Sequence, residues 1–391
     1  MMERLDVQAI GEVAAGLYRS RIGPSGVALE PRIRECLMTA SAGADIPFSQ
    51  NFLWLEWRHV VDAWNLRIWE EYRDVPRTGR RTRIGAKQRE TLWAIFERVR
   101  EQLVAAGEVT RAQQYHSLAD ALVSGGARPY DFVVADESQD LGVPELRFLS
   151  ALAPDSPDAL FFAGDLGQRI FQPPFSWKAL GIDIRGRSHV LHVNYRTSHQ
   201  IRRGADRLLP ETVADVDGVE ESRRGTVSVF NGPQPRMRLF DDAKSESEAV
   251  GEWLRDRLEA GCSADEIGVF VRSAAELARG QRAIELSGIE ALLLDEQQRP
   301  DERRIALGTM HRAKGLEFRA VAVMACDDEV IPNQARIESA DDMTDVEEIY
   351  DTERHLLYVA CTRARDELWV SGVEPGSEFL ADMRPHQRQR R

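Results

Sequence analysis

The chain has 391 residues, of which 43% are apolar, which is enough for two or three globular domains. It holds no run of roughly 18 apolar residues, and its first residues lack a basic-then-apolar signal pattern, so we predict a cytoplasmic protein without a membrane partner. The formal net charge of −13 argues weakly against nucleic acid as a partner, although the distribution of charge matters more than its sum.

Residues 1–127 are the first predicted domain, a mostly helical region. Apolar residues recur there at helical spacing, and tryptophans are frequent among them: Trp54, Trp57, Val60, Val61, Trp64 and Ile68. Such a stripe is either a helical core or a surface on which nucleic-acid bases stack. The basic stretch 77–89 follows, and a loop there would contact phosphates through Arg80, Arg81 and Arg83.

From residue 128 the pattern changes to short apolar runs, which predict strands at 131–135, 159–163 and 189–193. They alternate with helical segments, as in a parallel α/β sheet, and define a second predicted domain at 128–217. A polar boundary separates it from a third, 218–391, which ends in a basic tail. In that domain we expect helices at 244–260 and 274–287, and strands at 226–230, 237–240, 267–271, 291–294, 304–309 and 320–325.

One strongly acidic run interrupts the third domain. Residues 327–353 hold eleven acids, and Arg336 is the only basic residue among them. Runs of like charge are usually solvated surface, so this one is expected to be a flexible loop.

The first of these strands ends in paired acids, Asp136 and Glu137. Ligands of open α/β sheets bind at the carboxyl ends of the strands, so these two side chains are candidates for chemistry. Adjacent carboxylates suit nucleotide hydrolysis, because one can hold Mg²⁺ while its neighbour activates water. An isolated Asp-Glu pair is more often only an acidic strand end, and four further segments are needed to decide.

Those segments lie at strand ends or helix starts, in a fixed order. Gly164 to Phe171 follows the second strand and is succeeded by Trp177; the others are 194–198, 309–318 and 357–365. Each segment alone is weak evidence for function, since an arginine can form a surface ion pair and a histidine can be a turn residue. Five in this order and spacing are highly specific.

The set resembles motifs II to VI of superfamily I DNA helicases of the UvrD/Rep type, over roughly residues 130–372, with 50–125 similar to the helical insertion before motif II. The resemblance implies an α/β protein with two RecA-like parallel-sheet units, the first incomplete, preceded by a helical region. It also implies an ATP-dependent helicase or translocase that moves 3′→5′ on single-stranded DNA.

By the same resemblance, Asp136, in the Walker B position, holds Mg²⁺ and Glu137 orients and deprotonates the attacking water. Gln168 senses the γ-phosphate of ATP. Arg196 and Arg363 stabilise charge on the transferring phosphoryl group, a task that suits the permanently charged guanidinium.

The remaining positions that the resemblance implies bind nucleotide or DNA. Glu317 contacts the ribose, and the backbone of Gly315 lies near the phosphates. Phe171 and Trp177 stack on DNA bases, although Trp177 has a simpler alternative as a core aromatic.

The chain departs from the family in one decisive respect, because no Gly-x-x-x-x-Gly-Lys-[Ser/Thr] loop occurs in it. We therefore expect a truncated or split helicase, inactive alone and completed by a polypeptide that supplies the P-loop. Loss of that segment would leave strands 159–163 and 189–193 without their shared neighbour. The alternative is a non-catalytic module that binds nucleic acid or a partner. An unrelated α/β hydrolase is disfavoured, since no Ser/His/Asp arrangement is signalled.

Overall fold

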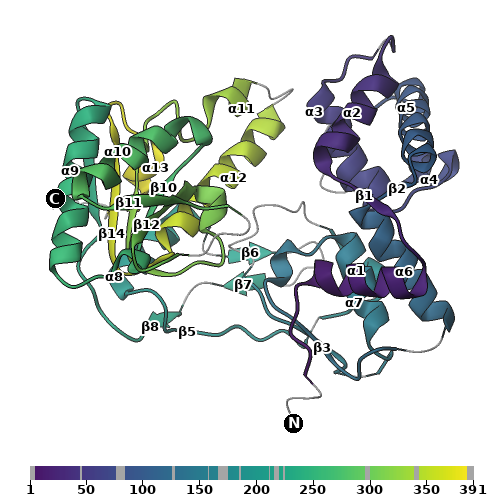
Figure 1. Ribbon diagram of the computed structural model, residues 1–391, viewed down its shortest axis with the longest axis horizontal. Coiled ribbons are helices and arrows are strands. Elements are labelled where there is room, and N and C mark those ends of the chain that lie inside the picture. The colour runs from purple at the N-terminus through teal and green to yellow at the C-terminus, as the bar shows by residue number, and fades with distance from the viewer. Residues whose placement is uncertain are drawn as a thin grey trace, which may run out of the picture. The chain divides into compact units, whose positions relative to one another are not determined.

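The structure, a computed structural model, describes residues 5–44, 46–75, 84–125, 128–156, 158–165, 175–184, 186–210, 212–214, 220–222, 225–295, 300–338 and 343–384. It divides into two compact units. The first unit contains the described residues up to Asp165 together with 175–187, and the second unit begins at Ser188 (Figure 1). Among the described residues, no helix is both long and apolar enough to cross a membrane.

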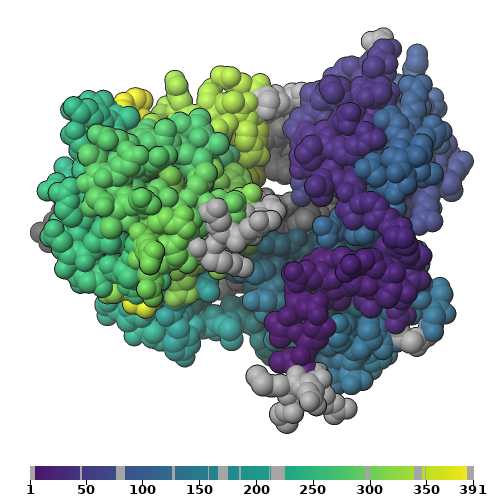
Figure 2. Space-filling view, in the orientation of Figure 1, coloured from purple at the N-terminus to yellow at the C-terminus, as the bar shows by residue number. Residues whose placement is uncertain are grey.

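The first unit is mostly helical, as predicted for residues up to 125. The helices that precede the predicted strand 131–135 are α1 (Ile10–Arg21), α2 (Glu30–Ser41), α3 (Gln50–Glu56), α4 (Trp69–Asp74), α5 (Ala86–Ala105) and α6 (Arg111–Gly125). A π-helical turn, Trp57–Asp62, continues α3, and β1 (Gly26–Ala28) pairs in parallel with β2 (Glu108–Thr110). In Figure 2 the helices α1 and α2, in purple, lie at the surface of this unit.

The tryptophan stripe belongs to a helical core. Trp54, Trp57 and Trp93 are buried among α2, α3 and α5. Tyr72 stacks on Trp93 at a centroid distance of 5.5 Å, and its hydroxyl donates a hydrogen bond to the buried Glu56 at 2.9 Å. Large aromatic rings supply most of the apolar area that a small helical cluster can bury, which explains their concentration here.

A small parallel sheet follows the helices in the first unit. It consists of β3 (Val133–Ala135) and β4 (Leu160–Phe162), with Val133 opposite Leu160. The helix between them, α7 (Val143–Leu152), packs on α1 and α6 through rings such as Phe148 and Tyr115, whose centroids are 5.4 Å apart. No other strand joins this pair within the described part of the chain.

The second unit is built on a six-stranded, wholly parallel sheet of order β11-β12-β10-β13-β14-β9. Its strands are β9 (Arg236–Phe240), β10 (Ile267–Val271), β11 (Glu290–Leu293), β12 (Arg304–Thr309), β13 (Phe318–Val323) and β14 (Ala364–Val373). Five helices accompany them: α8 (His199–Ala205), α9 (Ala243–Glu259), α10 (Leu277–Ser287), α12 (Met343–Cys361) and α13 (Phe379–Met383), with the short α11 (Gln334–Glu338) preceding α12.

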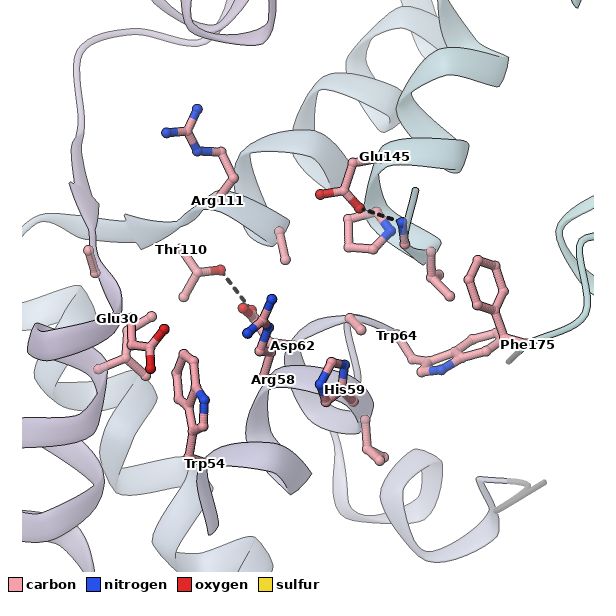
Figure 3. Close-up of a pocket in the computed structure, with 18 of the residues that line it drawn as sticks. Glu30, Trp54, Arg58, His59, Asp62, Trp64, Thr110, Arg111, Glu145 and Phe175 are labelled. Carbon is pink, nitrogen blue, oxygen red and sulfur yellow. Dashed lines mark hydrogen bonds between the residues drawn. The ribbon is translucent and has the colours of Figure 1, made fainter. Parts of the chain in front are cut away.

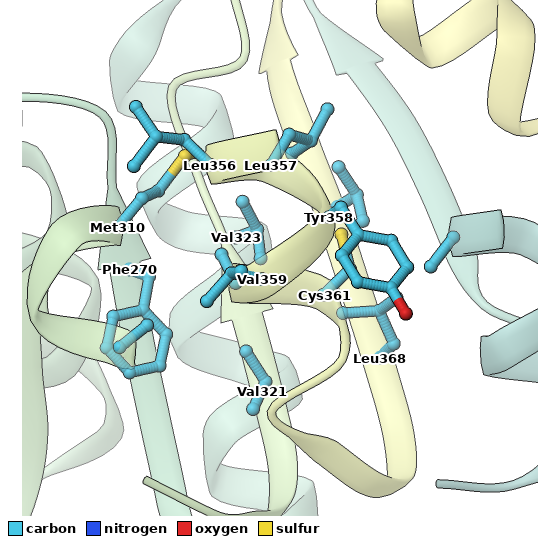
Figure 4. Packing of buried hydrophobic residues seen from close by; sticks show 14 of the residues in the cluster. Phe270, Met310, Val321, Val323, Leu356, Leu357, Tyr358, Val359, Cys361 and Leu368 are labelled. Carbon is cyan, nitrogen blue, oxygen red and sulfur yellow. The ribbon is translucent and has the colours of Figure 1, made fainter. Parts of the chain in front are cut away.

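Alternation along β10 explains why helices cover both faces of this sheet. Ile267, Val269 and Val271 belong to the apolar cluster with α9 and α10, whereas Phe270 belongs to the cluster with α8, α12 and α13. Figure 4 shows Phe270 beside the α12 side chains of this second cluster. Successive side chains of a strand point to opposite faces, so a continuous apolar run predicts burial on both. The predicted α/β class is confirmed, since the second unit is built on a parallel sheet covered by helices, while β3 and β4 form only a two-stranded parallel pair among the described residues of the first unit.

Two expectations for this unit need correction. The predicted strand 189–193 is reduced to β5 (Val193–Asn194), paired with β8 (Val227–Ser228), because no described strand lies on its other side. The acidic run is not a loop, since α11 and α12 occupy much of it and Glu353 on α12 is buried. A further short hairpin-like pair, β6 (Thr212–Ala214) and β7 (Glu220–Ser222), is antiparallel.

Candidate functional site

The predicted carboxylates lie in a tight loop directly after β3. Glu137 adopts the left-handed conformation, with φ 53°, and its backbone N–H donates to Asp136 Oδ1 at 2.8 Å. The Asp136 side chain is thus turned back onto its own loop while the residue stays exposed. A non-glycine residue with positive φ is uncommon and often marks a functional loop. This arrangement places two carboxylates, whose oxygens can coordinate a metal ion, at the carboxyl end of the strand.

Gln139 is a site residue that sequence reasoning missed. Its amide nitrogen donates to Glu137 Oε2, while its oxygen accepts the backbone N–H of Asp165 at 3.0 Å. The side chain is buried and so connects the loops after β3 and β4. A Cβ on Gly164 would lie 2.5 Å from both Gln139 Oε1 and Ser138 Oγ, so glycine permits the close approach. The sequence feature that could have identified Gln139 is its amide side chain, two residues after the acid pair.

These oxygen donors fit Mg²⁺ only in part. Mg²⁺ is usually held by one or two carboxylates together with waters and substrate phosphates. Asp136 and Glu137 fit the carboxylate share, and the described residues contain no group of three or more side chains able to hold a metal without a substrate.

Several predicted residues fall outside the described part of the chain: Arg80, Arg81, Arg83, Gln168 and Phe171. Trp177 is described, and its partly exposed ring meets Phe162 of β4 edge-on at a centroid distance of 5.0 Å. One part of the indole therefore packs on the sheet while another part remains open to solvent.

In the second unit, the turn between β12 and β13 carries two predicted residues. Gly315 has φ 75°, a conformation that glycine adopts without strain, and Glu317 follows just before β13. Arg196 Nε donates to Glu317 Oε2 at 2.9 Å, with 49% and 45% of the two side chains exposed. An ion pair this exposed contributes little to stability, so both groups remain available to a ligand.

Arg363 lies beside the same turn, at the end of α12, and is only 1% exposed. Its Nε donates to the carbonyl of Val359 at 3.1 Å and its Nη1 to that of Leu316 at 3.4 Å. Since Leu316 precedes Glu317, the structure brings Arg196, Glu317 and Arg363 together around one turn. These two carbonyl contacts fix the position of the guanidinium.

The segment that bears Arg196 is itself fixed to the α12–β14 junction. Thr197 Oγ1 donates to the carbonyl of Thr362 at 3.3 Å, and Ser198 N–H donates to that of Arg365 at 3.0 Å. Two motifs that are far apart in sequence are therefore adjacent in the second unit.

The second unit also contains a buried charge cluster. Glu353 is fully buried and forms ion pairs with Arg272, at the end of β10, and with Arg336. Burial, together with the charge of Arg272, lowers the pKa of His311 to about 4, so this imidazole is neutral at pH 7. Sequence reasoning missed Glu353 because composition cannot show which acid of a run faces a core.

Comparison with known proteins matches the same region. Residues 281–374 match the family described as "UvrD-like helicase C-terminal domain". The matched range includes Gly315, Glu317 and Arg363. The putative ATP-dependent DNA helicase YjcD of Bacillus subtilis is 40% identical over 86 residues, which is 22% of this chain and 11% of that protein. The ATP-dependent DNA helicase PcrA of Staphylococcus aureus is 37% identical over 81 residues, 21% of this chain and 10% of that one.

Two further similarities were found. The ATP-dependent DNA helicase srs2 of Schizosaccharomyces pombe is 33% identical over 93 residues, 24% of this chain and 9% of that protein. A solved structure, the C-terminal domain of a possible DNA helicase from Lactobacillus plantarum WCFS1, aligns with TM-score 0.34 and 22% identity over 49% of this chain and 94% of that one. The chain thus matches only about a tenth of the length of its curated relatives, and its C-terminal part is confirmed as similar to the C-terminal part of UvrD-type helicases.

Proposed function

We propose that the chain is part of a UvrD-like ATP-dependent DNA helicase or translocase, acting in the cytoplasm and moving 3′→5′ on single-stranded DNA. The observation that carries the proposal is the convergence of Arg196, Glu317 and Arg363 around one turn. Phosphoryl transfer requires fixed positive charge close to the transferring group, and two arginines supply it. The names of the matched relatives support ATP as the nucleotide and DNA as the substrate.

In this proposal the loop after β3 supplies the hydrolytic groups. Asp136 holds Mg²⁺, and Glu137 orients and deprotonates the attacking water, with Gln139 positioning the Glu137 carboxylate. Bound Mg²⁺ would neutralise charge on the β- and γ-phosphates. Gln168 senses the γ-phosphate, Glu317 contacts the ribose, and the Gly315 backbone lies near the phosphates.

The proposed DNA contacts lie in the first part of the chain. Phe171 and Trp177 stack on bases, and the partly exposed Trp177 ring supports this role. Arg80, Arg81 and Arg83 meet phosphates.

A further polypeptide segment supplies the P-loop, since the 391 residues contain none. Support comes from the open sheet of the first unit, where Val134 is 72% and Phe161 63% exposed. Among the described strands β3 and β4 pair only with each other, and the unpaired backbone N–H and C=O groups of an edge strand are a ready template for another strand.

Binding of single-stranded DNA can be tested with the chain as it stands, by fluorescence anisotropy of a labelled oligo-dT. Stacking contributes about 1–3 kcal/mol per base, so Trp177→Ala should weaken binding roughly 5- to 150-fold. Phe132→Ala is the matched control, because it removes a ring that is 70% exposed on the same unit. Affinity should fall steeply between low and physiological salt. No binding at low salt, or equal effects of the two variants, would refute the DNA assignment.

Hydrolysis is tested by phosphate release with Mg²⁺-ATP and oligo-dT. The chain alone should show no appreciable turnover, since a P-loop makes most direct contacts to the β- and γ-phosphates. In an assembly that does hydrolyse ATP, Arg196→Ala or Arg363→Ala should lower turnover by about 10³- to 10⁵-fold while nucleotide affinity changes much less. Robust turnover by the chain alone, abolished by Glu137→Gln, would show that the proposed need for a P-loop is wrong.

The alternative is a non-catalytic module that binds DNA or a protein partner. The missing P-loop sequence favours it specifically. In that case Arg196→Ala and Arg363→Ala leave DNA binding unchanged, and no added P-loop polypeptide restores turnover.

A further inference from the structure

The first unit contains a cavity of about 610 Å³ that none of the motifs explains. It lies among the end of β1, the π-helical turn 57–62 and the starts of α2, α6 and α7 (Figure 3). A volume of this size is typical of small-molecule sites, which run from about 300 to 1,000 Å³. Its lining combines aromatic rings, acids and arginines, so it is neither a packing defect nor a purely apolar void.

Two partly buried acids, Asp62 and Glu145, belong to the polar part of the lining. Asp62 accepts a hydrogen bond from Thr110 Oγ1 at 2.7 Å, and Glu145 accepts the backbone N–H of Gly142 at 3.1 Å. Burial raises the pKa of Asp62 to about 7 and also raises that of Glu145. A carboxyl that titrates near neutrality can both donate and accept a hydrogen bond. The edge of a heterocycle, which carries donors and acceptors side by side, needs that combination.

Flat aromatic surfaces form the apolar part. Trp54, Trp64 and Phe175 all line the cavity, and Figure 3 labels all three rings. The Trp54 ring already has the Arg34 guanidinium 4.7 Å from its centroid and that of Arg58 at 5.8 Å. Trp64 and Phe175 are therefore the rings best placed to receive a planar ligand by stacking.

The arginines of the lining indicate which planar ligands the cavity can bind. Arg58 and Arg111 both line the cavity, and each lowers the pKa of Glu145 through its positive charge. Arg34 is not part of the lining, and its Nε pairs with Glu30 at 2.7 Å. An anionic group such as a phosphate matches the donor fork of Arg58 or Arg111.

We propose that this cavity binds one nucleotide unit, with its base against Trp64 and Phe175, the base edge at Asp62 and Glu145, and its phosphate at Arg58 and Arg111. The unit comes either from free nucleotide or from a base turned out of single-stranded DNA. The site uses none of the residues assigned to ATP hydrolysis, so the inference goes beyond the proposed function and stands without it.

The test is calorimetric titration of the full chain with the four deoxynucleoside monophosphates, without Mg²⁺ or ATP. Binding of at least one is expected, with the matching nucleoside about tenfold weaker because it lacks the phosphate. Trp64→Ala should weaken binding roughly 5- to 150-fold, as loss of a stacked base does. Trp69→Ala is the control, since this half-buried ring packs on the same helical core without lining the cavity. Phe175→Leu gives a second, milder variant that leaves that core intact.

Competition identifies the source of the nucleotide. If oligo-dT displaces the monophosphate and shows the same Trp64 dependence, the ligand is a base of a strand; if it does not, the ligand is free nucleotide. Both outcomes support the site. Absence of binding at millimolar nucleotide, or equal losses in Trp64→Ala and Trp69→Ala, would overturn it. Neither outcome depends on Trp177 or on turnover, so failure here is distinguishable from failure of the proposed function.

Discussion

Two apolar strands, β10 and β4, differ in how far they are buried. β10 lies between β12 and β13, and all five of its residues are buried. β4 has one described neighbour, β3, and its Phe161 is 63% exposed. The strands differ in their surroundings rather than in composition, because helices cover both faces of the sheet of the second unit while the two-stranded sheet leaves Phe161 open.

The difference separates what a strand encodes from what its neighbours provide. A continuous apolar run specifies burial on both faces, but burial needs partner strands and covering helices. In the second unit these are all present. In the first unit Phe132, Val134 and Phe161 remain exposed on or beside β3 and β4. Contiguous exposed apolar surface commonly marks an interaction site, in agreement with the proposed completion by another polypeptide.

The largest expected effect tests how far the second unit is self-sufficient. Glu353→Ala would leave the buried Arg272 without its main counter-charge, which typically costs about 3–5 kcal/mol. Hydrogen exchange measured by mass spectrometry should show faster exchange in β10 and β12, with no change in α5 of the first unit. Urea unfolding gives the corresponding loss of free energy.

Asp351→Ala is the matched control, an exposed acid on the same helix, and should stay within about 0.5 kcal/mol of the unmodified chain. Replacing both partners, as Arg272→Met with Glu353→Leu, should recover much of the loss, because no charge is then left buried. Faster exchange spread equally over α5 would contradict the view that the two units are stabilised separately.

The sequence predicts strands accurately where the sheet is complete and less accurately where a strand lacks a neighbour. Strands 267–271 and 304–309 were predicted with their bounds, since apolar runs in a complete parallel sheet are unambiguous. Strand 189–193 was overpredicted because its apolar residues lack a neighbour, with Leu191 86% exposed. Local pattern shows that a residue is apolar, whereas pairing is a property of the whole sheet.

The same holds for the candidate site. Arg196, Glu317 and Arg363 were assigned through the resemblance to UvrD/Rep-type helicases, and the structure brings them to one turn. Gln139 was missed although its amide lies two residues after the acid pair, and Glu353 was missed because an acid turned toward a core has no signature in composition. The cavity residue Asp62 was missed for the same reason: its hydrogen bond to Thr110 joins residues 48 positions apart.

The smallest expected effect bears most directly on the contrast between the strands. Phe161→Ser should change the free energy of unfolding by less than about 0.5 kcal/mol, because a ring already in water loses little burial. Phe270→Ser is the matched change on β10 and should cost about 3–5 kcal/mol, since it removes a fully buried ring. Sedimentation velocity over a range of concentrations should also show less self-association for Phe161→Ser than for the unmodified chain, because an exposed apolar edge promotes association. If Phe161→Ser instead cost 2 kcal/mol or more, that ring would be covered in solution and the contrast with β10 would not hold.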